Sequence, residues 1–264
     1  MKLVIDNVSK NFIDPQGKQL SVLENVSLTV HSEEFVALVG PSGCGKSTLL
    51  NLTAGLLSPS DGSIYFTDLT EGHTPAMGIV FQETGLFPWR SVYENIAFGL
   101  EATGVPKTAQ KERIQHYINL VGLGGFEKAF PHQLSGGMRQ RVMIAIAFAC
   151  DPKILICDEP TTALDVTIQE QILDIIKNLQ KKNQTSVIMI THDLGVVANI
   201  AQKIAVMYSG IIVESGTCED IFYRPRHPYT WALIRSVPRL DLKNKQELAT
   251  IPGTPPDLLN PPVG

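Results

Sequence analysis

The stretch GPSGCGKST, Gly40–Thr48, constrains the fold of this chain more than any other feature. It satisfies the spacing G-x-x-x-x-G-K-[ST], in which glycines let backbone N–H groups curl around phosphates. A continuous apolar run at 34–40, EFVALVG, precedes it and predicts a strand that is buried on both faces. A helix is expected from Lys46 to about Leu56. A strand, a glycine loop and a helix in this order predict an α/β fold that binds phosphate.

Two side chains of this loop have defined chemical tasks. The ammonium of Lys46 is expected to reach the β- and γ-phosphates, and the hydroxyl of Ser47 is expected to ligate Mg²⁺. Cys44 lies among backbone N–H donors and near Lys46, which favours a lowered thiol pKa if the side chain is partly exposed. The alternative for Cys44 is a small filler side chain. The other loop residues expected to contact the nucleotide are Gly40, Pro41, Ser42, Gly43, Gly45 and Thr48.

Three later apolar runs, KILICDEP, SVIMITHD and KIAVMYSG, predict short strands, and the helical pattern VTIQEQILDIIKNLQKK separates the first two. Alternation of strand and helix predicts a mostly parallel sheet. Asp158 ends the first run, where a carboxylate can hold Mg²⁺ opposite Ser47. Glu159 beside it can orient or deprotonate the attacking water. The alternative is a pair of N-capping acids at a strand–helix turn.

Two further polar residues follow predicted strands. His192 comes after SVIMI, so it is expected at the same sheet edge as Gly40 and Asp158, where open α/β sheets bind ligands. An imidazole there can contact the γ-phosphate, and the alternative is a capping or structural histidine. Gln82 ends the predicted strand 78–82, GIVFQ, and can reach the metal or the water. The alternative for Gln82 is a polar strand end.

The rest of the chain divides into regions of different pattern. Residues 2–8 and 20–30 alternate like half-buried strands around a turn at DPQGK, and GSIYF at 62–66 predicts another strand. The region 89–150 has helical spacing and is expected as an insertion in the sheet.

The pattern divides the whole chain into two segments. Residues 1–223 are expected to form the nucleotide-binding domain, and the proline-rich residues 224–264 are expected to form an extended arm.

Composition excludes several classes of protein. The net charge is −4 and no basic stripe stands out, which argues against nucleic acid as a partner. The 4 cysteines form no C-x-x-C pair, which argues against a zinc site. The N-terminus MKLVIDNVSK turns polar at once, unlike a signal peptide. The longest apolar run, near VMIAIAFAC, is too short to span a bilayer, so work at a membrane requires a partner that spans it.

A second stretch, LSGGMRQ at 134–140, places Ser135, Gly136 and Gly137 directly ahead of a long apolar helix. A helix N-terminus of this kind is another way to build an anion site. The pattern raises the question of why one chain has two phosphate-binding helix starts.

These motifs together resemble the ATP-binding-cassette (ABC) ATPases over nearly the whole chain. GPSGCGKST looks like the Walker A motif and ILICDEP like Walker B with its catalytic glutamate. LSGGMRQ looks like the family signature, and TALD at Thr162–Asp165 like the D-loop. Gln82 resembles the Q-loop glutamine and His192 the switch histidine, and Phe12 in VSKNF matches the aromatic that stacks on adenine.

The resemblance implies a fold and a mechanism. The fold is a P-loop NTPase whose mostly parallel core sheet carries an N-terminal antiparallel β-subdomain and an inserted helical subdomain. Two cassettes pack head to tail with ATP and Mg²⁺ between them. Ser135, Gly136 and Gly137 of one subunit then close over the γ-phosphate held by the other, with Asp165 near the nucleotide. Closure driven by ATP and opening driven by hydrolysis follow, because the γ-phosphate joins the subunits only while it is present.

Partners follow from the same resemblance. The segment Glu83–Asn95 clusters Leu86, Phe87, Pro88 and Trp89, and exposed aromatics of this kind mark a partner site. In the family this region forms the groove for a transmembrane permease, which in turn meets a solute-binding protein. Such a subunit lies peripherally on the cytoplasmic face of the membrane. The alternative is that these side chains pack under the helical subdomain.

Two branches of importer ATPases contribute to the resemblance. MGIVFQETGLFPWRSVYENIAFGL is similar to the ATPases of nitrate, sulfonate and taurine importers. VMIAIAFACDPKILICDEPTTALDVTIQEQIL, RPRHPYTWALIRSVPRL and IPGTPPDLLNPP are similar to those of dipeptide, oligopeptide and nickel importers. The solute therefore stays open, as does a homo- or heteromeric dimer. The alternatives to an importer subunit are a soluble ABC ATPase, which typically carries two cassettes or a coiled-coil insertion, and a small-molecule P-loop kinase, which has no use for LSGGMRQ.

Overall fold

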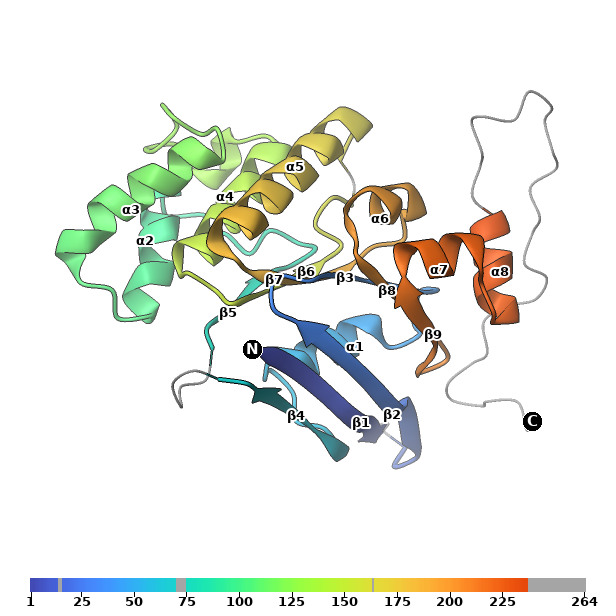
Figure 1. Ribbon diagram of the computed structural model, residues 1–264. Coiled ribbons are helices and arrows are strands. Elements are labelled where there is room, and N and C mark those ends of the chain that lie inside the picture. The colour runs from blue at the N-terminus through green and yellow to red at the C-terminus, as the bar shows by residue number, and fades with distance from the viewer. Residues whose placement is uncertain (14–15, 70–74, 163, 237–264) are drawn as a thin grey trace, which may run out of the picture. The chain divides into compact units, whose positions relative to one another are not determined.

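The structure is a computed structural model that describes residues 1–13, 16–69, 75–162 and 164–236 (Figure 1). Its contacts divide the chain into two compact units. One unit combines residues 1–70 with the chain from 190 onward, and the other comprises residues 71–189.

The first unit contains an antiparallel sheet of the order β2-β1-β4. Its strands are β1 (Lys2–Ile13), β2 (Gln19–His31) and β4 (Asp61–Thr67). Leu3 of β1 pairs with Val30 of β2 on one side and with Phe66 of β4 on the other. This sheet is the predicted N-terminal β-subdomain, and the alternating pattern extends further along the chain than expected.

The same unit contains the strand that leads into the phosphate loop. Strand β3 (Phe35–Val39) is buried at every residue and pairs in parallel with β8 (Lys203–Tyr208). Strand β9 (Ile211–Thr217) runs antiparallel along β8. Helix α1 (Lys46–Thr53) follows the loop. The predicted order of buried strand, glycine loop and helix is confirmed, whereas β9 was not predicted.

Three short helices complete the first unit. They are α6 (Leu194–Ile200), α7 (Cys218–Tyr223) and α8 (Pro228–Arg235). The expectation of an extended arm from residue 224 is wrong for α8, which is helical because Pro228 is preorganised for the first helical position and His227 caps it. The remainder of the expected arm, 237–264, lies outside the described residues.

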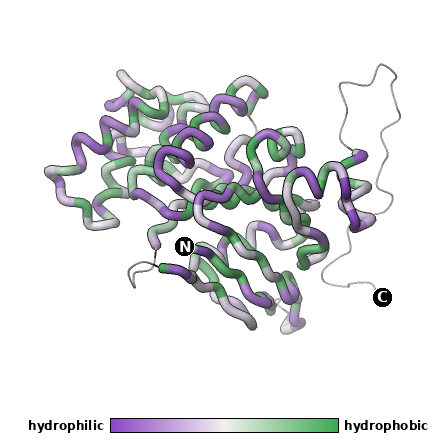
Figure 2. The backbone as a smooth tube through the Cα atoms, in the orientation of Figure 1, coloured by the Kyte–Doolittle hydropathy of each residue, from purple (hydrophilic) through white to green (hydrophobic). Residues whose placement is uncertain are grey.

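The second unit holds the strand that carries the acidic pair. Strands β5 (Met77–Val80), β6 (Ile154–Asp158) and β7 (Ser186–Ile190) lie in the order β5-β6-β7, with β5 and β6 parallel. The strands β6 and β7 are mainly hydrophobic (Figure 2), and β6 ends on the polar Asp158. Helix α5 (Val166–Asn183) connects them. Strand β5 ends before Gln82, so this residue lies in the following loop and not at the strand end that the pattern predicted.

The predicted helical insertion is present in the second unit. It contains α2 (Val92–Ala102), α3 (Lys107–Leu120), a short 3-10 turn (Pro131–Gln133) and α4 (Gly136–Ala149). Its core includes Ile96, Ile114, Ile118, Ile144 and Phe148, each inaccessible to solvent. Among the described residues, no helix combines the length and the apolar character that crossing a membrane requires.

Candidate functional site

The phosphate loop folds around the ammonium of Lys46. This residue is 8% exposed, and its Nζ donates hydrogen bonds to the carbonyl oxygens of Gly40 at 2.9 Å and Pro41 at 2.8 Å. These contacts hold the ammonium across the loop, directly ahead of the first turn of α1. The first N–H groups of a helix have no carbonyl partner within it and bear partial positive charge. A desolvated ammonium beside such a helix start is an arrangement that binds phosphate.

Two glycines make this loop possible. Gly45 has φ 100° and caps α1, and a Cβ on it would lie 2.6 Å from Cδ2 of Leu23. A Cβ on Gly40 would lie 2.3 Å from the carbonyl oxygen of Met207. A side chain at either position therefore displaces the loop, because one glycine has a left-handed backbone and the other presses on a backbone atom that cannot yield.

Cys44 is not the reactive thiol that its neighbours suggested. Its side chain is 3% exposed, and burial raises the thiol pKa despite the attraction of Lys46, whose Nζ lies 3.8 Å from Sγ. The carbonyl of Cys44 accepts a hydrogen bond from the N–H of Gly210 at 3.1 Å. The expectation of a lowered pKa is wrong because it required partial exposure, and the filler interpretation agrees with the structure.

Two more predicted residues lie in the first unit. Phe12, near the end of β1, is 37% exposed, and the ammonium of Lys10 lies 5.2 Å from its ring centroid. An exposed aromatic face is available for stacking on a base. His192 follows β7 and is exposed. It does not cap α6, because Asp193 does so by accepting hydrogen bonds from the N–H groups of Gly195 and Val196.

In the second unit, Glu159 has an unusual backbone conformation. Its φ is 45°, in the left-handed region that costs a non-glycine residue about 1–2 kcal/mol. Its Oε2 accepts hydrogen bonds from Oγ1 of Thr162 at 2.9 Å and from Nε2 of Gln82 at 3.3 Å. The structure therefore brings together Gln82 and Glu159, 77 residues apart in sequence. Thr162, predicted only as the first residue of the D-loop, is a direct partner of the carboxylate.

The capping interpretation of the acidic pair does not agree with α5. Asp158 is the last residue of β6, and the residue that caps α5 is Asp165, which accepts a hydrogen bond from the N–H of Ile168 at 2.9 Å. Backbone strain is tolerated where a residue has a functional task. Asp158 and Glu159 therefore remain candidates for holding a cation and orienting water.

The signature stretch builds the start of α4. The hydroxyl of Ser135 accepts a hydrogen bond from the N–H of Met138 at 3.2 Å, and Ser135 and Gly136 are exposed. A Cβ on Gly137 would lie 2.5 Å from Cγ2 of Ile168 in α5. Glycine at this position lets the starts of α4 and α5 approach each other, which brings the signature close to the D-loop.

The predicted magnesium ligands are consistent in chemistry. Ser47, Gln82 and Asp158 offer hydroxyl, amide and carboxylate oxygens, which are the donors that Mg²⁺ prefers. Ser47 belongs to the first unit, and Gln82 and Asp158 belong to the second. Within the part of the chain that the structure describes, no group of three or more histidine, cysteine, aspartate or glutamate side chains offers a separate metal site.

The aromatic segment before α2 combines packed and exposed side chains. Leu86 is 9% exposed, and the Phe87 ring packs edge-on against Phe98 with a centroid distance of 4.7 Å. Arg90 lies over the Phe98 ring at 4.9 Å, and Trp89 is 71% exposed. Leu86 and Phe87 therefore pack against the helical region, as the alternative interpretation expected. Trp89 is exposed and remains available to a partner.

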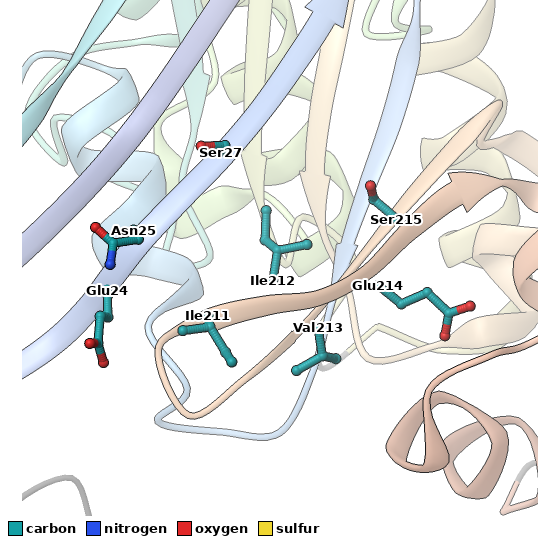
Figure 3. Close-up of a pocket in the computed structure, with 8 residues that line it drawn as sticks. All are labelled: Glu24, Asn25, Ser27, Ile211, Ile212, Val213, Glu214 and Ser215. Carbon is teal, nitrogen blue, oxygen red and sulfur yellow. The ribbon is translucent and has the colours of Figure 1, made fainter.

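A pocket of about 650 Å³ is lined by residues of β2 and β9, and none of the phosphate loop residues is among those that line it (Figure 3). Glu24 and Glu214 line it, but Figure 3 shows their carboxylates pointing away from each other. The Glu214 carboxylate accepts hydrogen bonds from the N–H groups of Arg226 and His227. Two carboxylates arranged in this way do not form a cation site, so the candidate functional residues are those of the loops described above.

Comparison with known proteins supports the interpretation of these motifs. A family model described as ABC transporter matches residues 23–162, and a model described as the C-terminal region of oligopeptide and dipeptide transporters matches residues 213–264. The oligopeptide transport ATP-binding protein OppD of Bacillus subtilis is 47% identical over 94% of this chain and 75% of its own length. The dipeptide transport ATP-binding protein DppD of the same species is 45% identical over 99% of this chain and 84% of its own length.

Solved structures show the same fold. A dimeric post-hydrolysis state of the ATP-binding cassette MJ0796 bound to ADP and Pi has a TM-score of 0.72 and 30% identity, and covers 82% of this chain and 98% of its own. The cbiO1 protein of Clostridium perfringens, part of a transporter complex, has a TM-score of 0.74 and 28% identity, with 84% and 90% covered. The predicted fold is confirmed: an ATP-binding cassette with a mostly parallel core sheet, an N-terminal antiparallel β-subdomain and an inserted helical subdomain.

Proposed function

The chain belongs to the ABC transporter family as an ATP-hydrolysing subunit that powers a membrane importer, and we propose that its solutes are oligopeptides or dipeptides. The observation that supports this solute class is the match of residues 213–264 to a C-terminal region described for oligopeptide and dipeptide transporters. The relatives named above also span both halves of the chain. The similarity of the N-terminal half to nitrate and sulfonate importers stays a prediction about the permease contact.

In this proposal, the phosphate loop binds the triphosphate of ATP. The ammonium of Lys46 exchanges its carbonyl contacts for the β- and γ-phosphate oxygens, which is a short movement because it already lies across the loop. The N–H groups of residues 40–48 contribute the remaining contacts. Phe12 stacks on the adenine.

Mg²⁺ accompanies ATP in the proposed site. Ser47 and Asp158 would hold it, and Gln82 would supply an amide oxygen. When bound, the ion neutralises charge that develops on the β- and γ-phosphates.

Hydrolysis in the proposed site depends on Glu159. Its carboxylate accepts a proton from the attacking water or orients that water for an in-line attack. Thr162 and Gln82 hold the carboxylate by hydrogen bonds of 2.9 Å and 3.3 Å, which fixes its direction before the nucleotide binds. The imidazole of His192 contacts the γ-phosphate. The strained backbone of Glu159 is consistent with a side chain held in place for this task.

The second helix start belongs, in this proposal, to the nucleotide of a second cassette. Ser135, Gly136 and Gly137 close over the γ-phosphate bound by the partner subunit, with Asp165 next to them. Two helix N-termini from different subunits then share one γ-phosphate, and its hydrolysis releases the dimer.

The segment Glu83–Asn95 is the proposed contact with the transmembrane permease, and the solute-binding protein acts indirectly through that permease. Trp89 is exposed for this contact, while Phe87 and Leu86 anchor the segment on the helical region. The subunit is then peripheral at the cytoplasmic face of the membrane. Because Gln82 directly precedes the segment and bonds Glu159, movement at the nucleotide and at the permease contact is linked.

The proposal is tested by reconstitution with the oligopeptide or dipeptide permease and its binding protein in vesicles. Peptide-loaded binding protein is expected to stimulate ATP hydrolysis. The permease and binding protein of a nitrate or taurine importer are not expected to stimulate it. Replacing Glu83–Asn95 by the corresponding segment of a different importer is expected to change the permease that copurifies. Deleting residues 237–264 serves as the matched control. A partner choice that follows this deletion and ignores the swap would contradict the permease assignment.

A further inference from the structure

Helix α8 is tied to strand β9 before its first turn begins. Both oxygens of the Glu214 carboxylate are used, since Oε1 accepts from the N–H of Arg226 at 2.8 Å and Oε2 from the N–H of His227 at 3.0 Å. Burial by itself raises the pKa of this carboxyl, but the hydrogen bonds outweigh it and the pKa is lowered. Nδ1 of His227 then accepts from the N–H of Tyr229 at 3.1 Å and caps the helix. The position of α8 on this unit is therefore specified by polar contacts.

The helix places one aromatic ring against the end of β8. The rings of Tyr229 and Tyr208 lie 4.5 Å apart between centroids, at an interplanar angle of 40°. Tyr229 also packs on the core that contains Val39, the residue that directly precedes the phosphate loop. Burial, with smaller contributions from Cys44 and Tyr208, raises the pKa of Tyr229 to about 12, so its hydroxyl is neutral at physiological pH. The ring is thus half-buried and packs on the core from which the phosphate loop begins.

Tyr208 opens the turn that forms the back wall of the loop. Ser209 and Gly210 have φ of 47° and 82°, the conformation of a tight hairpin between β8 and β9. The N–H of Gly210 donates to the carbonyl of Cys44 at 3.1 Å. On the other side of Tyr208, the carbonyl of Met207 lies directly under Gly40. The two contacts that support the loop from behind therefore flank the residue on which Tyr229 packs.

We propose that Tyr229 is a positioning residue for ATP binding: it holds Tyr208 and the β8–β9 turn, and through them the back of the phosphate loop, in the shape that Lys46 requires. This inference rests on the proposed function. It assigns the start of the C-terminal region a task at the nucleotide site, because displacement of α8 loosens the loop and, by reciprocity, ATP binding stabilises the position of α8.

The test uses the full chain and compares Tyr229→Ala, Tyr229→Phe and Trp231→Ala. Trp231 is the matched control, since it lies on the same helix, is 48% exposed and packs against Arg235. The dissociation constant of a non-hydrolysable ATP analogue and the KM and kcat for ATP are measured, together with the melting temperature without nucleotide.

Tyr229→Ala is expected to weaken nucleotide binding and raise KM by about threefold to tenfold, as the loss of one aromatic pair suggests, with kcat at saturation changed less than about twofold. Tyr229→Phe keeps the ring and is expected to bind like the wild type, as is Trp231→Ala. A lowered melting temperature with an unchanged dissociation constant would overturn the inference, because the ring would then serve stability alone.

Two further outcomes are distinguishable. If Tyr229→Ala does not fold, Tyr229→Leu preserves apolar volume without the aromatic pair, and the same comparison of binding with melting decides. If the wild-type chain itself fails to bind the analogue, the proposed function fails, and the positioning inference fails with it.

Discussion

Replacing Glu159 by glutamine separates its chemistry from its structural contacts. The carboxamide oxygen can still accept from Thr162 and Gln82, whose bonds to Oε2 are 2.9 Å and 3.3 Å, so the fold and ATP binding are expected to be unchanged. The basic oxygen is lost. A general base contributes about 10²–10⁴ in rate, so turnover of bound ATP is expected to fall by that factor, or about 3–5 kcal/mol in barrier.

The backbone of Glu159 provides a second measure of the same site. Glu159→Ala and Glu159→Gly both remove the carboxylate and its hydrogen bonds, but only glycine adopts φ 45° without steric cost. The glycine variant is expected to be more stable than the alanine variant by about 1 kcal/mol, while both hydrolyse ATP as slowly as Glu159→Gln. Urea unfolding measures the first difference and single-turnover phosphate release the second.

Gel filtration with ATP completes the assay of Glu159→Gln. The variant is expected to accumulate as an ATP-bound dimer, because the γ-phosphate that joins two subunits is not cleaved. Hydrolysis by the glutamine variant within about threefold of the wild type would remove Glu159 from the catalytic role. An alanine variant as stable as the glycine variant would refute the assignment of backbone strain.

Three other predictions concern the loop and the signature. Lys46→Ala is expected to weaken ATP binding by about ten- to a hundredfold, the worth of a charge-assisted hydrogen bond, and an unchanged dissociation constant in a fluorescence titration would contradict its phosphate contact. Because burial raises the pKa of Cys44, its thiol stays protonated at pH 7–8. A thiol alkylator is therefore not expected to inhibit ATP hydrolysis by reacting with Cys44. Inhibition that ATP prevents and that Cys44→Ser abolishes would contradict this. Gly137→Ala places a Cβ 2.5 Å from Cγ2 of Ile168, which is expected to cost about 1–3 kcal/mol of stability and to weaken the ATP-bound dimer. Gly136→Ala, whose Cβ would lie 3.5 Å from Leu164, is the control by thermal melting, and equal melting temperatures would argue against close packing of α4 and α5.

Local pattern was sufficient for the main elements of the chain. Buried strand, glycine spacing and helix start are all encoded within a few residues, so the phosphate loop and the strand that ends at Asp158 were predictable. The short elements β9, α6 and α7 were not, because stretches of 6 or 7 residues have too little periodicity to be read. Helix α8 was not predicted because the prolines around it indicated an extended arm, although Pro228 is the first residue of the helix.

What the sequence by itself determined is the fold family and a set of candidate site residues: those expected to bind phosphate, ligate a cation or act on water, most of them at a predicted strand end or helix start. What only the tertiary structure decided is how they are held. The carboxylate of Glu159 accepts a hydrogen bond from Gln82, which is 77 residues away in sequence. Burial raises the pKa of Cys44, opposite to the expected direction, and the ring of Tyr229 packs against that of Tyr208. The physical reason is that residue type and spacing specify local backbone and chemistry, whereas burial and side-chain contact depend on which distant segments the fold brings together.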